Sequence, residues 1–308
     1  MQIVFMGTPE FAVPSLESLI QANHTVCGVF TQPDKPKGRG YTMTPPPVKV
    51  CALAHQVEVY QPKTLRNEEA AELIRGLRPD VIVVVAYGKI LPKEILDIPK
   101  YGCINVHASL LPKYRGAAPI QWSVLNGDQI TGITTMYMAE GIDTGNMIMK
   151  SSTEIAPDET AGELHDRLSV MGGELIVRTL RAVEDGTAVR TPQSEEETCY
   201  APMLTKELSR IDWNKPAQEI HNLVRGLSPW PVANTLFKDK LLKIYQTKII
   251  DGFSGKPGQV ISSNGIFSVC CGQNSTVELV EVQLEGKKRM SGKEFLLGHP
   301  LSGEMILR

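Results

Sequence analysis

Val81-Ile-Val-Val-Val-Ala86 is an unbroken run of β-branched and small apolar residues within the N-terminal half of the chain. A strand with one solvated face alternates apolar and polar residues, whereas a continuous apolar run predicts a strand buried on both faces. Such strands are typical of parallel sheets whose two faces are covered by helices. This segment therefore indicates an α/β domain.

The sequence on either side of this strand alternates between predicted strands and predicted helices. Further strands are predicted at 2–6, 24–31, 103–108, 133–138 and 147–155, and helices at 11–21, 67–76, 118–125 and 161–184. This alternation predicts a doubly wound, Rossmann-like domain with a mostly parallel sheet, in which ligands bind beyond the carboxyl ends of the strands. The turn Gly7-Thr8-Pro9-Glu10 lacks the G-x-G-x-x-G pattern, so no nicotinamide or flavin cofactor is expected.

The C-terminal third has a different sequence pattern. A polar, acidic stretch at 191–198 (TPQSEEET) is typical of a linker, and a short helix is predicted at 216–227. Closely spaced strands at 234–237, 241–250, 258–262, 266–271 and 276–284 predict a small, OB-like β-barrel. We therefore predict an N-terminal domain over 1–189, a linker over 190–205 and a C-terminal barrel over 206–308.

The composition is that of an ordinary globular protein. The chain has 308 residues, with 42% hydrophobic and 21% charged residues, and no apolar run approaches the roughly 18 residues of a membrane helix. Its N-terminus does not resemble a signal peptide, and none of its six cysteines forms C-x-x-C. We expect reduced thiols in a cytoplasmic protein, with no disulfide, no metal and no membrane association.

Charge is unevenly distributed along the chain. Residues 1–205 contain 18 basic and 24 acidic residues, a net charge of −6, whereas residues 206–308 contain 14 and 10, a net charge of +4. A basic C-terminal part is compatible with a polyanionic partner.

Asn105-Val-His107 places two polar side chains at the end of a predicted buried strand. Alternate strand residues share a face, so Asn105 and His107 should lie side by side. An amide donor beside an imidazole can stabilise an oxyanion and move a proton, although such pairs also occur as satisfied core groups. Asp143, in the turn Gly141-Ile-Asp-Thr-Gly145, is either a turn-forming aspartate or a partner that holds and polarises His107.

The segment 32–47 predicts a long loop rich in proline, glycine and cations. Lys35, Lys37 and Arg39 stand close together in it and could reach phosphates, or the loop could simply be solvated. Arg115 precedes the predicted helix at 118–125, and one interpretation of it is a surface cation.

Taken in order, these motifs resemble one family, the formyltetrahydrofolate-dependent formyltransferases. The resemblance spans essentially the whole chain and rests on Met6-Gly-Thr-Pro-Glu-Phe11, the Gln32-Pro-Asp…Gly38-Arg-Gly40 loop, Asn105-x-His107, Ser109-Leu-Leu-Pro-x-Tyr-Arg-Gly116, Gly141-x-Asp143-x-Gly145, Ile211-Asp-Trp213 and Pro229-Trp-Pro231. Within the family, the chain is similar to the branch that acts on charged initiator tRNA. The resemblance implies a one-carbon transferase of translation initiation.

The resemblance also implies roles for individual residues. The formyl group of 10-formyltetrahydrofolate, the co-substrate, would pass to the α-amine of methionyl-initiator tRNA. Asn105 and a protonated His107 would stabilise the oxyanion, and Asp143 would orient His107 and help to remove the ammonium proton. Folate contacts are implied at Ser109, Leu110, Leu111 and Pro112, and tRNA contacts at Lys35, Lys37, Arg39 and Lys206. No metal is required, and we expect a monomer.

Three alternatives share part of this pattern. A sugar-nucleotide N-formyltransferase would share the Asn105, His107 and Asp143 triplet, but the Gly38-Arg39-Gly40 loop and the basic C-terminal part disfavour it. A glycinamide ribonucleotide formyltransferase would usually lack the C-terminal domain. A catalytically inactive RNA-binding relative is disfavoured by the intact triplet.

Overall fold

The computed structural model describes residues 1–37, 41–251, 255–263, 265–300 and 304–308. They form two compact units. Unit 1 comprises residues 1–116, 131–153 and 165–200, and unit 2 comprises residues 117–130, 154–164 and 201–308. Unit 2 thus includes two segments, 117–130 and 154–164, from the range that the sequence predicts as the N-terminal domain. The predicted division into a catalytic domain over 1–189, a linker over 190–205 and a tRNA-binding domain over 206–308 remains a prediction.

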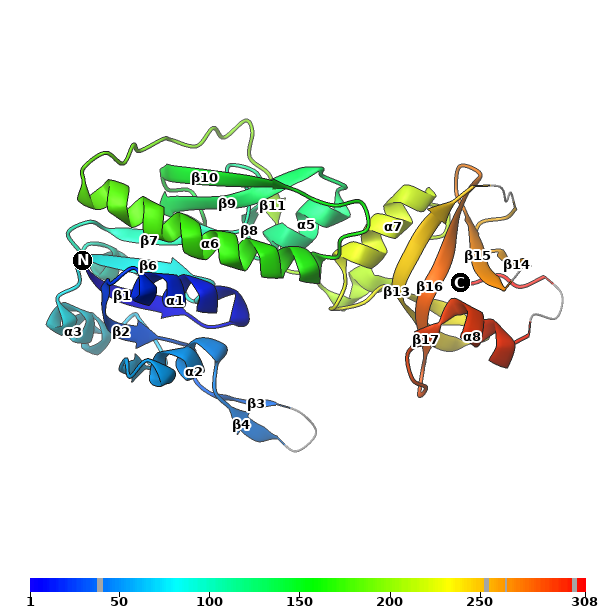
Figure 1. Cartoon of the computed structure of the whole chain (residues 1–308), viewed down its shortest axis with the longest axis horizontal. Coiled ribbons are helices and arrows are strands. Elements are labelled where there is room, and N and C mark those ends of the chain that lie inside the picture. The colour runs from blue at the N-terminus through cyan, green and yellow to red at the C-terminus, as the bar shows by residue number, and fades with distance from the viewer. Residues whose placement is uncertain (38–40, 252–254, 264, 301–303) are drawn as a thin grey trace. The chain divides into compact units, whose positions relative to one another are not determined.

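Unit 1 is built on a seven-stranded mixed sheet with the strand order β10-β9-β7-β6-β1-β2-β5 (Figure 1). Five strands run parallel and β9 is antiparallel to β7. The strands span Gln2–Gly7 (β1), Thr25–Phe30 (β2), Val59–Tyr60 (β5), Val81–Val85 (β6), Cys103–His107 (β7), Ile130–Tyr137 (β9) and Met147–Glu154 (β10). Every residue of β6 is buried, as its continuous apolar sequence predicts.

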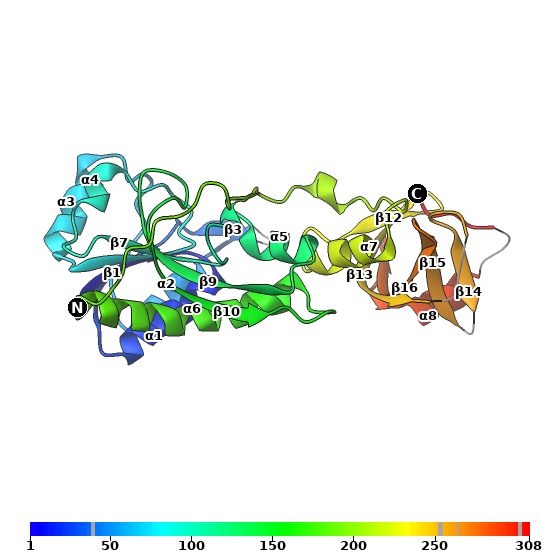
Figure 2. The ribbon, with the colours of Figure 1, turned by 90° about the horizontal axis from the view of Figure 1, so that it is seen from above.

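Helices cover both faces of this sheet, which confirms the predicted doubly wound class. Figure 2 shows α3 and α4 on one face and α1 and α6 on the other. Gly173 allows α6 to approach α1 closely, since a Cβ there would lie 2.8 Å from the Pro14 carbonyl oxygen. The helices span Val13–Gln21 (α1), Pro47–Ala54 (α2), Glu68–Leu77 (α3), Lys93–Leu96 (α4) and Ala161–Glu184 (α6), with a 3₁₀ turn at Glu10–Ala12 (η1).

Unit 2 contains an antiparallel sheet with the order β12-β13-β16-β15-β14, and β17 pairs with β16. The strands span Asn234–Phe237 (β12), Lys240–Ile250 (β13), Val260–Ser263 (β14), Ile266–Cys271 (β15), Ser275–Leu284 (β16) and Met290–Ser291 (β17). The last residues of the chain bridge the two edge strands. Val260 N donates to the Met305 carbonyl oxygen (2.8 Å) and Leu236 N to that of Arg308 (2.7 Å). This bridge closes the sheet into the predicted barrel.

Three helices accompany the barrel. They are α5 (Pro119–Leu125), α7 (Ala217–Gly226) and α8 (Gly292–Gly298), and a 3₁₀ turn, η2, spans Lys206–Ser209. Helix α7 packs on β13 and α8 on β15 and β16, so their apolar residues, among them Phe295 of α8, complete the barrel core with Phe237 and Phe267. No helix in the described part of the chain is both long enough and apolar enough to cross a membrane.

Several short elements have no counterpart among the predicted ones. The 32–47 loop contains a hairpin of β3 (Lys35–Lys37) and β4 (Thr42–Thr44), and α2 begins at the predicted end of that loop. Strands β8 (Arg115–Gly116) and β11 (Tyr200–Ala201) pair with one another. Their two-residue length carries no periodic signal, which is why the sequence does not reveal them.

Candidate active site

Asn105 and His107 lie at the carboxyl end of β7, beside the end of β6. Asn105 is level with Val84 and His107 is level with Thr134 of β9. Since β6 and β7 run parallel, their carboxyl ends form one edge of the sheet, where ligands of such folds bind. His107 is buried and Asn105 partly exposed, so the predicted pair occupies the predicted edge.

Asp143 approaches this pair from a turn 38 residues away in the sequence. Its Oδ1 lies 3.4 Å from Asn105 Nδ2, and its Oδ2 lies 3.5 Å from His107 Nδ1. Oδ2 also accepts a hydrogen bond of 2.9 Å from the backbone N–H of Gly116. Asp143 has a positive φ of 52°, a conformation that short polar side chains tolerate. The structure therefore brings the three predicted residues together.

The hydrogen bonds of His107 define its tautomer. Its Nε2 lies 2.8 Å from the Tyr114 carbonyl oxygen, which can only accept, so Nε2 carries a hydrogen. In a neutral ring Nδ1 is then a bare acceptor that faces the Asp143 carboxylate, which is also an acceptor. One additional proton between these two atoms removes that conflict. The His107 Nδ1 and the Asp143 carboxylate thus face one another at the carboxyl ends of the strands.

A second layer of contacts, which no sequence pattern indicates, fixes the Asp143 turn. Gln193 Nε2 donates to the carbonyl oxygens of Asp143 (2.7 Å) and Gly145 (2.8 Å). The Gln193 Oε1 accepts from Arg115 Nε at 2.9 Å. Gln193 lies in the polar stretch that is predicted as a linker, where no local pattern distinguishes it from its neighbours.

Arg115 is 1% exposed and is therefore not a surface cation. Its guanidinium forms two parallel hydrogen bonds, of 3.0 and 3.1 Å, with the Glu195 carboxylate. This contact raises the pKa of Arg115 and lowers the pKa of Glu195. The planar, permanently charged guanidinium links Glu195 and Gln193, and through Gln193 it supports the Asp143 turn.

The predicted folate segment follows β7 directly. Ser109, Leu111 and Pro112 are buried, and Leu110 is partly exposed. Thr134 fixes the backbone of this segment, because its hydroxyl donates to the Ser109 carbonyl oxygen (2.7 Å) and accepts from Leu111 N (3.1 Å). A ligand at this edge would therefore meet the Leu110 side chain and backbone groups, rather than all four side chains.

The residues predicted to contact tRNA are separated along the chain. Lys35 is exposed on β3 of unit 1, and Lys206 is exposed at the start of η2 of unit 2. Arg39 and the side chain of Lys37 lie outside what the structure describes. Lys35 takes part in the hairpin backbone pairing, level with Thr44.

Comparisons with known proteins agree with this architecture. Residues 1–180 match the formyl transferase family model and residues 203–300 match the formyl transferase C-terminal domain. A methionyl-tRNA formyltransferase of Agathobacter rectalis is 55% identical over 97% of this chain and 96% of its own length. The corresponding protein of Acetivibrio thermocellus is 50% identical over 99% of both chains.

Solved structures show the same fold at low identity. An N-formyltransferase of Helicobacter canadensis, crystallised with folinic acid and dTDP-3-aminofucose, superposes with a TM-score of 0.69. It is 20% identical and covers 90% of this chain and 98% of its own. Both family models match, and relatives of at least 50% identity extend over the full length of the chain. This chain therefore belongs to the formyl transferase family, among the methionyl-tRNA formyltransferases.

Proposed function

We propose that this protein transfers the formyl group of 10-formyltetrahydrofolate to the α-amine of methionyl-initiator tRNA. The observation that carries the proposal is the convergence of Asn105, His107 and Asp143 at the carboxyl edge of the sheet. Formyl transfer to an amine needs a donor for the developing oxyanion, a group that accepts the ammonium proton and a group that protonates the leaving nitrogen. These three side chains can meet those needs.

Asn105 would donate a hydrogen bond to the oxyanion. Its amide has two N–H donors, and among the described residues only the long 3.4 Å contact with Asp143 engages them. One donor is therefore free to meet an oxygen that gains negative charge in the transition state. An oxyanion donor of this kind typically contributes about 3–4 kcal/mol to transition-state stabilisation.

His107 and Asp143 would act together as the acid and base of the reaction. In its unprotonated state, the pair accepts a proton from the attacking amine. The pair then gives this proton to the leaving folate nitrogen. While the proton is held, the imidazolium adds positive charge beside the oxyanion. A direct hydrogen bond from His107 to the oxyanion would require Nε2 to leave the Tyr114 carbonyl oxygen.

The folate donor supplies the electrophilic formyl carbon. Leu110 would contact its ring system, and the backbone of 109–112 would read its polar edge from the position fixed by Thr134. Asn105 is then within the same strand-to-loop segment as the folate contacts. Most of the rate enhancement would come from holding the two substrates together.

The tRNA would be held by residues of both halves of the sequence. Arg39, with Lys35 and Lys37, would approach the acceptor end, and the basic part over 206–308, with Lys206, would contact phosphates. Recognition of an RNA helix by shape and phosphates suits a barrel with a net charge of +4. We place the protein in the cytoplasm, as a monomer, at the initiation step of translation.

A comparison of two formyl acceptors tests the proposal. Purified protein is given 10-formyltetrahydrofolate with methionyl-initiator tRNA, and separately with a sugar-nucleotide amine. We expect formylation of the tRNA-bound methionine alone. Formylation of the sugar amine with no reaction on tRNA would overturn the proposed acceptor, and no reaction with either would overturn the proposed activity.

A further inference from the structure

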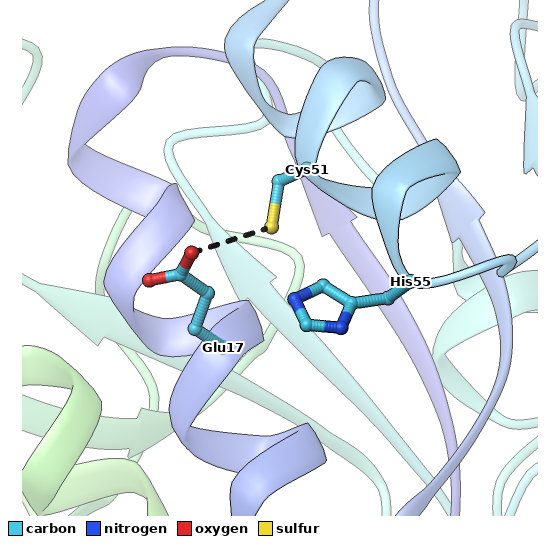
Figure 3. Close-up of side chains that lie close together, drawn as sticks. All are labelled: Glu17, Cys51 and His55. Atoms are coloured by element: carbon cyan, nitrogen blue, oxygen red, sulfur yellow. Dashed lines mark hydrogen bonds between the residues drawn. The ribbon is translucent and has the colours of Figure 1, made fainter.

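Outside the site just described, three side chains of different donor chemistry converge between helices α1 and α2. Figure 3 shows Glu17 of α1 pointing toward Cys51 of α2 and toward His55, which caps the end of α2. One ligand atom from each residue lies within 4.8 Å of the other two, and Cys51 Sγ lies 4.0 Å from Glu17 Oε1. We propose that these three residues form a binding site for a zinc ion.

The spacing of the ligands suits a transition metal. Cys51 and His55 are four residues apart, so successive turns of α2 place them on the same side of the helix. Zinc holds thiolate, imidazole and carboxylate ligands at about 2.0–2.3 Å, which puts neighbouring ligand atoms roughly 3.3–3.8 Å apart in a tetrahedral site. The ligand atoms lie within 4.8 Å of one another, so their separations would need to shorten by at most about 1.5 Å, within reach of side-chain rotation.

The polar groups of these three side chains form no hydrogen bond outside the cluster in the described part of the chain. Among the described residues, neither ring nitrogen of His55 has a hydrogen-bond partner, and the Glu17 carboxylate is bonded only to the Cys51 thiol. Cys51 is buried, Glu17 is half-buried and His55 is exposed, so an ion can enter from the His55 side. The site is therefore shielded on one side and open on the other.

The ligand set selects the metal. A thiolate with an imidazole favours zinc and related soft or borderline ions over magnesium and calcium, which take oxygen ligands. Burial and the nearby Glu17 carboxylate raise the pKa of the Cys51 thiol, whereas a bound zinc ion would favour the thiolate. Binding replaces the S–H bond with a sulfur–zinc bond and releases one proton to solvent.

The described residues supply three ligands, so the fourth position would hold water or an exchangeable group. The ion would join α1 to the C-terminal half of α2. Lys49 on the same helix bonds Asp34 (2.8 Å), which lies directly before the β3–β4 hairpin. A bound ion would thus hold in place α2, the helix that follows this hairpin in the sequence. It shares no residue with the Asn105, His107 and Asp143 triplet and goes beyond the proposed function.

Cobalt titration tests the proposal directly. Full-length protein, freed of metal by a chelator and kept reduced, is titrated with Co²⁺ under anaerobic conditions. We expect one equivalent to produce visible d–d bands of a tetrahedral site and a near-ultraviolet thiolate-to-cobalt band, and one equivalent of Zn²⁺ to abolish both. Absence of the thiolate band at stoichiometric cobalt would overturn the proposal.

Variants assign the bands to these residues. Cys51→Ser should remove the thiolate band, whereas the matched control Cys27→Ser should keep it. His55→Ala and Glu17→Gln should each weaken binding by about tenfold or more. His55 is exposed, so His55→Ala should leave the fold intact and keeps the test decisive if Cys51→Ser does not fold. Unchanged cobalt affinity in both His55→Ala and Glu17→Gln would refute the site.

Discussion

At the scale of single residues, the site depends on where hydrogens can be placed. The Tyr114 carbonyl oxygen fixes a hydrogen on His107 Nε2, and this leaves Nδ1, which faces the Asp143 carboxylate, without a hydrogen in the neutral ring. A pair in this arrangement differs from an ordinary buried histidine because one hydrogen shared by Nδ1 and the carboxylate would satisfy both atoms. The proposed acid–base role follows from this geometry.

His107→Ala should lower kcat by about 10²-fold or more, because the group that carries the proton is removed. Steady-state kinetics with methionyl-initiator tRNA measure the effect, and circular dichroism checks the fold. His24→Ala, a partly exposed histidine of the same unit, should keep normal turnover. Near-normal kcat in the His107 variant would exclude the mechanism.

Gln193 is a positioning residue, and Gln193→Glu tests this role. Glutamate keeps the shape but cannot donate to the Asp143 and Gly145 carbonyl oxygens. The displaced Asp143 turn should reduce kcat by about 10- to 100-fold with little change in KM for tRNA. Gln21→Glu, at the exposed end of α1, is the matched control. A fall in thermal midpoint with unchanged kcat would indicate a purely structural role.

At the scale of elements, helix α6 shows how a local signal specifies a boundary. Thr160 and Glu163 form a reciprocal cap: Glu163 N donates to Thr160 Oγ1 (3.2 Å), and Thr160 N donates to Glu163 Oε2 (2.9 Å). This motif needs only residues three apart in sequence, so it can be recognised without the fold. The predicted start of the helix at residue 161 is confirmed.

The same cap predicts a dependence on pH. Hydrogen bonds from Thr160 lower the pKa of Glu163, so its contribution is present above the usual glutamate pKa of about 4.3 and is lost as pH falls through the lowered value. Glu163→Gln should lower the denaturation midpoint at pH 7, and the difference from the unmodified protein should vanish in the acid range. A difference that persists at pH 2 would contradict this assignment.

The β3–β4 hairpin is the second element with a testable role. Arg39→Ala should lower kcat/KM for methionyl-initiator tRNA and leave folate binding unchanged, because the variant cannot pair with a phosphate and the folate segment is not touched. Lys150→Ala removes a charge from an exposed position on β10 and should have no such effect. Equal kcat/KM for tRNA in both variants would reject the role of Arg39.

At the scale of the whole molecule, charge is divided between the two ends of the sequence. Truncation after residue 205 is a poor test of the basic part, since segments 117–130 and 154–164 belong to the same unit as the barrel and would be left without it. Charge substitutions in the full-length chain avoid this problem. Lys287 and Lys288 are exposed just before β17 and are suitable positions.

The double variant Lys287→Gln/Lys288→Gln should weaken tRNA binding and reduce the slope of log K against log salt, by up to about one for each lysine that pairs with a phosphate. Binding isotherms at several salt concentrations measure this slope. Lys93→Gln, which removes a charge paired with Asp97 in unit 1, is the control. An unchanged slope in the double variant would show that these lysines do not bind tRNA.

Periodicity, capping and strand alternation are local properties, so they predict the fold class, the main strands and helices and the Asn105/His107 pair without the tertiary structure. Which distant segments meet depends on tertiary packing. It brought Gln193 to the Asp143 turn across 50 residues, closed the barrel with the last residues of the chain and placed Glu17 beside Cys51 across 34 residues. Such contacts depend on how whole elements pack against one another, and no spacing within a single segment encodes them.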